Sequence, residues 1–201
     1  MQRSLRGTLL AAVLLVLTLP ALSAQTTGTP VFHAPYRAFQ KSELGASLSD
    51  FGDVALEAFY GFGSGKNDFG IRAGFASYPG DNTNLLVGAD FRSRVVTHTQ
   101  DFPLDGALTI GFGATLGDAG DVFLIPVGLS LGRRIDLENS STSFVPYVQP
   151  VIAPAFGEGD SDVLFSVGLG VDIRLGRAFD LRLSGGIGDI DGVAISFAWV
   201  R

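Results

Sequence analysis

The sequence contains no cysteine, only two lysines, and no long apolar run after its first 24 residues. Without cysteine there are no disulfides, so hydrogen bonds and packing must hold the fold together. No later stretch approaches the roughly 18 consecutive apolar residues of a membrane helix. So few lysines are unusual for a water-facing surface, which normally carries many charges of both signs. The formal net charge of −6 argues against nucleic acid as a partner.

The first 24 residues have the organisation of a secretory signal peptide. Arg3 and Arg6 give a charged start, Leu9–Leu19 is an apolar core, and Pro20–Ala24 supplies a break and small residues. The apolar core is too short for a membrane helix. We predict cleavage near the end of this segment, which makes the exported chain more acidic still.

The next segment, residues 25–42, contains Pro30 and Pro35 and shows no sustained hydrophobic period. This pattern predicts an N-terminal tail or linker. The remaining residues, 43–201, have a normal length for one domain.

Ten segments of this domain alternate in hydrophobicity and are separated by glycine, aspartate, asparagine or proline. No stretch shows a sustained helical period. The short links predict an all-β, antiparallel up-and-down barrel of eight to ten strands. The candidate strands are Glu43–Ser49, Val54–Gly63, Phe69–Ser77, Leu85–Val96, Ala107–Leu116, Val122–Gly132, Phe144–Phe156, Val163–Leu175, Phe179–Gly185 and Val193–Arg201.

The clearest alternation runs over Val163–Leu175, where every second residue is apolar. If Leu175 lies opposite Phe179, one face of the hairpin is wholly apolar. The other face then carries two ion pairs, Arg174 with Asp180 and Asp172 with Arg182. Such cross-strand pairs help to set register.

Two further hairpins can be aligned in the same way. Pairing Phe75 with Val87 places Arg72 opposite Asp90. Pairing Ile187 with Val193 places Leu183 opposite Phe197, with small polar residues on the other face.

Alternating strands fit either a soluble barrel with an apolar core or a membrane barrel with an apolar exterior. The polar face here is rich in glycine, and glycine weakens a strand unless close approach demands it. In a crowded barrel lumen, other groups would approach the strand backbone closely enough to require glycine. The arginines of this face have acidic partners, as buried charges need. Phe69, Phe156, Phe179 and Trp199 lie near strand ends, where a membrane barrel has its aromatic girdle. These features favour a transmembrane barrel.

The signal peptide, the alternating strands of about ten residues and a last strand with Phe197 and Trp199 resemble small Gram-negative outer-membrane β-barrels. This is the class of the OmpA-like transmembrane barrels, and the resemblance covers residues 43–201. It implies a location in the bacterial outer membrane and contact with its lipid.

Catalytic chemistry has little support in the sequence. The exported chain has only His33 and His98, and His98 lies in a link with Asp101 and no nucleophile motif. Some barrels of the class modify lipids with histidine and a serine or an acid, so a lipid-modifying enzyme stays an alternative. We expect no enzymatic activity and a monomeric protein.

Alternate turns of such a barrel share an end, and one end collects mainly acidic residues. Carboxylates on glycine-rich turns suit Ca²⁺ or Mg²⁺, which would allow bridging to lipopolysaccharide. The residues that could bind the ion are Asp118, Asp121, Asp160, Asp162, Asp189 and Asp191. Ordinary turn chemistry is the simpler explanation. The other end collects Lys66, His98, Arg133, Arg134, Arg177 and Arg201 with some acids.

The inward charges allow two roles for the lumen. Arg72, Asp90, Asp172, Arg174, Asp180 and Arg182 either line a narrow ion path or, with other side chains, fill the interior. We therefore expect a structural outer-membrane barrel or a narrow passive channel. A soluble exported barrel that binds an apolar ligand is the alternative from another class.

Overall fold

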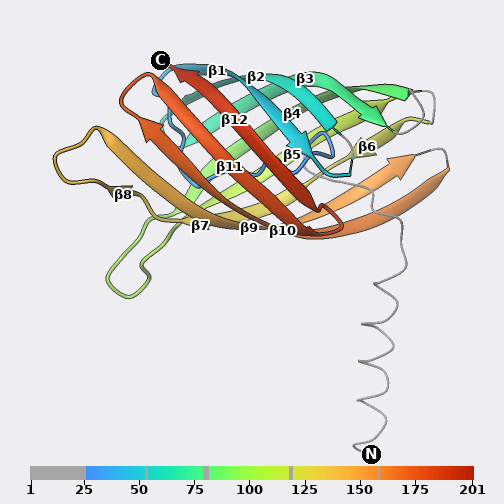
Figure 1. The fold of residues 1–201 in the computed structure, drawn as a ribbon. Helices are drawn as coiled ribbons and strands as arrows, with labels where there is room; N and C mark the ends of the chain where they lie inside the picture. Colours follow the sequence, from blue (N-terminus) through green and yellow to red (C-terminus); the bar gives the residue numbers. More distant parts are fainter. Residues whose placement is uncertain (1–25, 53, 79–81, 118–119, 158) are drawn as a thin grey trace, which may run out of the picture.

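The protein is a closed, all-β, antiparallel barrel with ten strand positions in its wall (Figure 1). We call each position a stave, whether one strand or two strands in line occupy it. The computed structural model describes residues 26–52, 54–78, 82–117, 120–157 and 159–201. The predicted signal peptide, residues 1–24, lies outside this part of the chain. In the described residues, no helix has the length and apolar character needed to cross a membrane.

The ten predicted strands are all present. Two of the observed strands, β6 and β7, together form one stave, and β8 is a short addition beside β9. The strands are β1 (Ser42–Asp50), β2 (Val54–Ser64), β3 (Asn67–Tyr78), β4 (Asn82–Val96), β5 (Asp105–Leu116), β6 (Val122–Leu124), β7 (Val127–Gly132), β8 (Ile135–Asp136), β9 (Thr142–Gly157), β10 (Asp160–Leu175), β11 (Phe179–Gly188) and β12 (Gly192–Val200).

Each stave pairs with its neighbours in sequence, and β12 pairs with β1 to close the barrel. The predicted antiparallel up-and-down barrel is therefore confirmed at ten staves. Closure removes the free sheet edges that would otherwise seek other chains. One end of the barrel, here called the C-terminal end, holds Ser42, Arg201 and the links after β2, β4, β7 and β10. The opposite end holds the links after β1, β3, β5, β9 and β11.

The stave formed by β6 and β7 is interrupted at Ile125 and Pro126. Its neighbour β9 carries Pro146, Pro150 and Pro154, which have no N–H to donate. The carbonyls of Pro146 and Pro154 accept hydrogen bonds from backbone amides of the β6–β7 stave. The nitrogens of these two prolines face the same stave, so two donors are missing from the ladder between β9 and the β6–β7 stave. Register partners between β7 and β9 are accordingly broken in the middle of β7. This seam has the sparsest backbone ladder of the described wall.

We expect amides of β7 to exchange with deuterium faster than amides of β1, because β1 is continuously paired on both sides. Hydrogen–deuterium exchange of the refolded protein in detergent micelles measures this difference. Equal protection of β7 and β1 would show that the seam is no weaker than the rest of the wall.

The apolar face of the strands points outward, as predicted for a membrane barrel. Phe165 and Leu169 are 53% and 48% exposed, whereas Asp172 and Arg174 are 2% and 8% exposed. An outer face of this kind suits lipid, and its strands pair with a neighbour on each side. The soluble alternative, in which the apolar face of the strands forms the core, is wrong, because that face points outward. Exposed apolar residues include Leu44, Leu48, Leu56, Ile71, Phe75, Phe112, Ile152, Val163, Ile187 and Val193.

Exposed aromatic side chains lie toward both ends of the barrel, with Phe112 and Phe123 6.4 Å apart toward the opposite end and more ring pairs toward the C-terminal end. Phe62 stacks on Phe69 with ring centroids 5.6 Å apart, and Phe69 lies 4.9 Å from Phe91. Phe179 stacks on Phe197 at 5.4 Å. Aromatic rings at this level fit a membrane–water interface, so this end lies near one surface of the bilayer.

Candidate functional site

The lumen is occupied by the chain's own N-terminal segment, residues 26–41, here called the threaded segment. It is drawn in blue inside the barrel in Figure 1 and leads into β1 at the C-terminal end. Thr29, Phe32 and Ala34 are at most 1% exposed. The segment predicted as an N-terminal tail or linker is therefore buried over these residues. They pack inside the barrel, because the inward face of the wall supplies partners for their backbone.

The wall holds the backbone of the threaded segment with side-chain donors. Carbonyls of the segment accept hydrogen bonds from serine, tyrosine and arginine side chains on several strands, at 2.5–2.9 Å. A main chain without sheet partners is thereby satisfied away from water. The pairs are Ser184 with Pro30, Tyr147 with Phe32, Ser130 with His33, Arg92 with Ala34, and Arg174 with Tyr36.

Glycines on the inner face make room for the threaded segment. A Cβ at Gly168 would overlap the ring of Phe32, and one at Gly113 would overlap the Thr26 backbone. Gly186 also borders the Phe32 ring. The glycine-rich polar face predicted a crowded lumen, and the threaded segment is what crowds it.

Replacing Gly168 with valine should expel the threaded segment, because the added methyl groups need the space of the Phe32 ring. Valine itself favours a strand, so the wall should still form. We expect chymotrypsin to cleave after Phe32 in G168V much faster than in the wild type. The neighbouring variant L169V changes a lipid-facing residue and should resist like the wild type. Equal resistance of folded G168V would contradict this packing.

Glu57 on β2 anchors the start of the threaded segment. Its carboxylate accepts hydrogen bonds from Thr27 at 2.6 Å and Thr29 at 2.8 Å. Arg72 on β3 lies 3.4 Å from the same carboxylate, and both side chains are buried. The partner of Arg72 is therefore Glu57, a residue that the sequence analysis did not single out.

The predicted pair of Arg72 with Asp90 is wrong. In the β3–β4 hairpin Arg72 lies opposite Gly88, and Asp90 lies opposite Gly70. Among the described residues, Asp90 forms no ion pair within 4 Å. The hairpin of β11 and β12 is also displaced from its predicted register by two residues, with Leu183 opposite Ile195. A shift of two keeps every side chain on its face, so alternation alone could not detect either error.

The predicted register of β10 and β11 is confirmed, with Leu175 opposite Phe179. The structure places Arg174 Nε 3.9 Å from Asp180 and Arg182 Nε 3.8 Å from Asp172. Arg182 makes closer bonds to Asp180, at 2.9 Å, and to Glu43 on β1, at 2.5 Å. Arg182 is thus the centre of a buried network of three carboxylates. Glu43, like Glu57, is a partner that the sequence analysis did not single out.

Replacing Arg182 with methionine should destabilise the barrel by about 3–5 kcal/mol, because it leaves buried carboxylates without their cation. The matched control is R134M. Arg134 bonds Asp136 at 2.7 Å, but both side chains are largely exposed, so this loss should cost less than about 1 kcal/mol. Urea unfolding of the refolded variants, followed by tryptophan fluorescence, compares them. Equal stabilities would show that the network contributes nothing.

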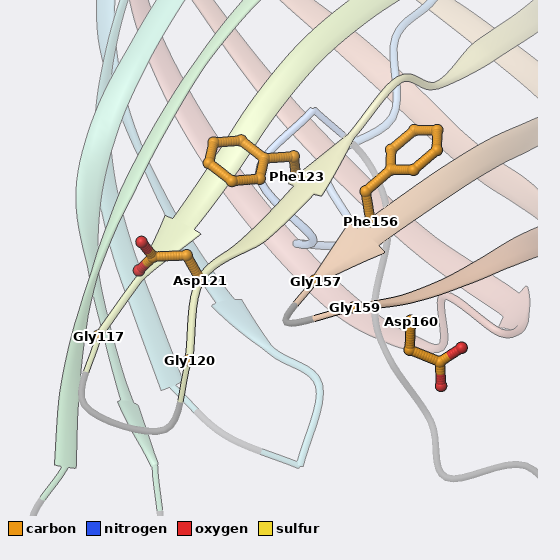
Figure 2. Close-up of a pocket in the computed structure, with 8 residues that line it drawn as sticks. All are labelled: Gly117, Gly120, Asp121, Phe123, Phe156, Gly157, Gly159 and Asp160. Atoms are coloured by element: carbon orange, nitrogen blue, oxygen red, sulfur yellow. The ribbon is translucent and has the colours of Figure 1, made fainter.

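The acidic residues at the opposite end do not form a cation site in the described part of the chain, where no three His, Asp or Glu side chains gather closely enough. A shallow pocket of about 500 Å³ there includes Asp121 and Asp160. Figure 2 shows these two side chains pointing away from one another. Asp162 accepts a hydrogen bond from the Val163 amide, and Asp189 accepts one from the Phe165 amide on β10. Of the other predicted ligands, Asp191 joins no such group, and Asp118 lies outside the described residues.

His98 is held in place by Asp105 rather than by Asp101. Its Nδ1 lies 2.7 Å from Asp105 Oδ2, and the Tyr36 hydroxyl donates to the same carboxylate. Through Asp105, these two hydrogen bonds connect the link after β4, which holds His98, to Tyr36 of the threaded segment. In the described structure, the hydrogen-bond partner of this histidine side chain is the carboxylate and not a serine or threonine hydroxyl.

Comparison with known proteins gives only distant likenesses in fold. No protein-family model and no curated protein matches the chain. A bacterial polysaccharide outer-membrane secretin superposes with a TM-score of 0.45 at 13% identity. That superposition covers 73% of this chain and 55% of the secretin, so the chain spans about half of that protein. The β-domain of the Bordetella autotransporter BrkA gives a TM-score of 0.41 at 14% identity, covering 79% of this chain and 96% of the domain.

The closed barrel itself defines the class of the protein. Its staves pair on both sides, its outer face is apolar, and the ion pairs of Arg72, Arg92 and Arg182 lie inside. These are the properties of an outer-membrane β-barrel.

Proposed function

We propose that the protein is an outer-membrane barrel closed at rest, which forms a narrow passage only when the threaded segment leaves the lumen. It acts as a monomer among the lipids of the outer membrane. The supporting observation is that wall side chains donate five hydrogen bonds of 2.5–2.9 Å to the main chain of the segment, beside the apolar packing of Phe32 and Phe39 against the wall.

A polar wall of this kind suits reversible closure. Water can replace each wall-to-segment hydrogen bond, so departure of the segment leaves a lumen that hydrates readily. Glu57, Arg72 and Arg92 would then line the opened passage.

A purely structural barrel is the second candidate, and the number of bonds to the segment favours it. In that role the segment is a fixed core of the barrel. The two candidates differ in whether removal of the segment creates conductance.

We also propose that the protein has no catalytic activity. His98 lies 2.7 Å from Asp105, and the Tyr36 phenol donates to the same carboxylate. This arrangement joins a link to the threaded segment, and it supplies no activated serine. A lipid-modifying role would need a nucleophile beside His98.

Planar-bilayer recording tests the passage. The wild-type barrel should show no steady conductance, and a variant lacking residues 26–40 should conduct ohmically. A second variant, T27A/T29A, keeps the segment but removes its bonds to Glu57, and it should open intermittently. Heat-modifiable migration on a gel shows that each variant is folded.

Two results would overturn the proposal. Steady wild-type conductance would show that the segment does not close the lumen. Folded variants that both stay silent would support the structural role instead.

A further inference from the structure

The C-terminal end of the barrel contains a cavity of about 840 Å³ formed by the threaded segment and the surrounding links. Its lining is dominated by cationic side chains, and the one acidic residue in it, Asp68, is already bonded to Arg92 at 3.1 Å. We call this cavity the cationic mouth. The cationic residues that concern the argument are Arg37, Lys66, Arg94, Arg174, Arg177 and Arg201.

Several of these charges have no carboxylate partner. Among the described residues, no aspartate or glutamate lies within 4 Å of the side-chain nitrogens of Lys66, Arg94 or Arg177. Arg134, also in the lining, differs because Asp136 neutralises it. Unpaired positive charges in one cavity repel each other, and a bound anion would remove this repulsion. The concentration of positive charge is local, because the whole chain has a net charge of −6.

The buried lining residue, Arg174, retains unused donor capacity. It is only 8% exposed, and one of its terminal nitrogens donates to the Tyr36 carbonyl at 2.9 Å. Its Nε makes no hydrogen bond and lies 3.9 Å from Asp180, so the guanidinium is held at the mouth by one hydrogen bond and one long ion pair.

Other lining groups are already positioned. The guanidinium of Arg37 donates to the carbonyls of Asn67 and Gly65 at 2.8 and 3.0 Å, and it lies 5.6 Å from the Phe39 ring. Arg201 differs, because its guanidinium lies 4.1 Å from the ring of the outward-facing Trp199. The contacts of Arg37 limit its side-chain motion, so less entropy is lost when a ligand binds.

We propose that the cationic mouth binds a soluble, multiply charged phosphate compound. Guanidinium forks match phosphate oxygens in geometry and charge, and several arginines suit a ligand with several phosphate groups. The volume lies within the usual range of small-molecule sites. The cavity lies inside the end of the barrel and the lipid contacts lie on its outer wall, so the mouth takes phosphate from solution rather than from lipid headgroups.

Calorimetry with sodium tripolyphosphate tests the site on the full barrel refolded in uncharged detergent at physiological salt. The wild type should bind one equivalent saturably. The variant R94Q/R177Q should bind at least about tenfold more weakly, since it loses two charge-assisted contacts to phosphate. The matched control K41Q/R133Q removes two positive charges at the same end, neither of them in the lining, and it should bind like the wild type.

Three results would overturn the inference. The first is that the wild type shows no saturable binding of tripolyphosphate. The second is that K41Q/R133Q loses as much affinity as R94Q/R177Q. The third is that phosphatidic acid in the micelles competes for the same site and abolishes tripolyphosphate binding. The measurement uses the closed barrel, so it stands or fails independently of the conductance experiment.

Discussion

The structure depends on one constraint, which is that polar groups inside the barrel must find partners largely within the protein. The threaded segment contains two prolines and has no strand beside it to pair with. Its carbonyls are instead met by side chains such as Ser184, Tyr147 and Arg174. This requirement explains why the inner face carries hydroxyls and guanidinium groups at positions where a soluble barrel would place leucine or valine.

The same constraint accounts for the arrangement of charge. A buried carboxylate needs a cation or several donors, and Glu57 receives both from Arg72 and two threonines. Arg182 is shared among three carboxylates from different strands, so it joins β1, β10 and β11 on the inner face of the wall. Ion pairs of this sort add little to stability over an apolar core, but they favour one register over its neighbours.

Much of the wall could be predicted from the sequence, because alternation over strands such as Val163–Leu175 reports directly which face is apolar. The β10–β11 register was also accessible, since its three-residue turn leaves one alignment that matches charges. The Arg72–Asp90 register was not, because a shift of two residues preserves both faces. The threaded segment lacks any period, so nothing local marks it as buried. The available signals were indirect, namely an inward Glu57 with no assigned partner and inner-face glycines such as Gly168.

The threaded segment links the two proposals physically. Tyr36 and Arg37 belong to this segment, yet both help to form the cationic mouth through Arg174 and the links after β2. If the segment leaves the lumen, the mouth loses Arg37, and Arg174 loses its carbonyl partner. An anion that binds the complete mouth therefore binds the closed state better than the open state. By linkage, such an anion stabilises closure, and loosening the segment weakens the anion's binding by the same factor. The phosphate compound would then act as a ligand that keeps the barrel shut, rather than as a solute waiting to cross it.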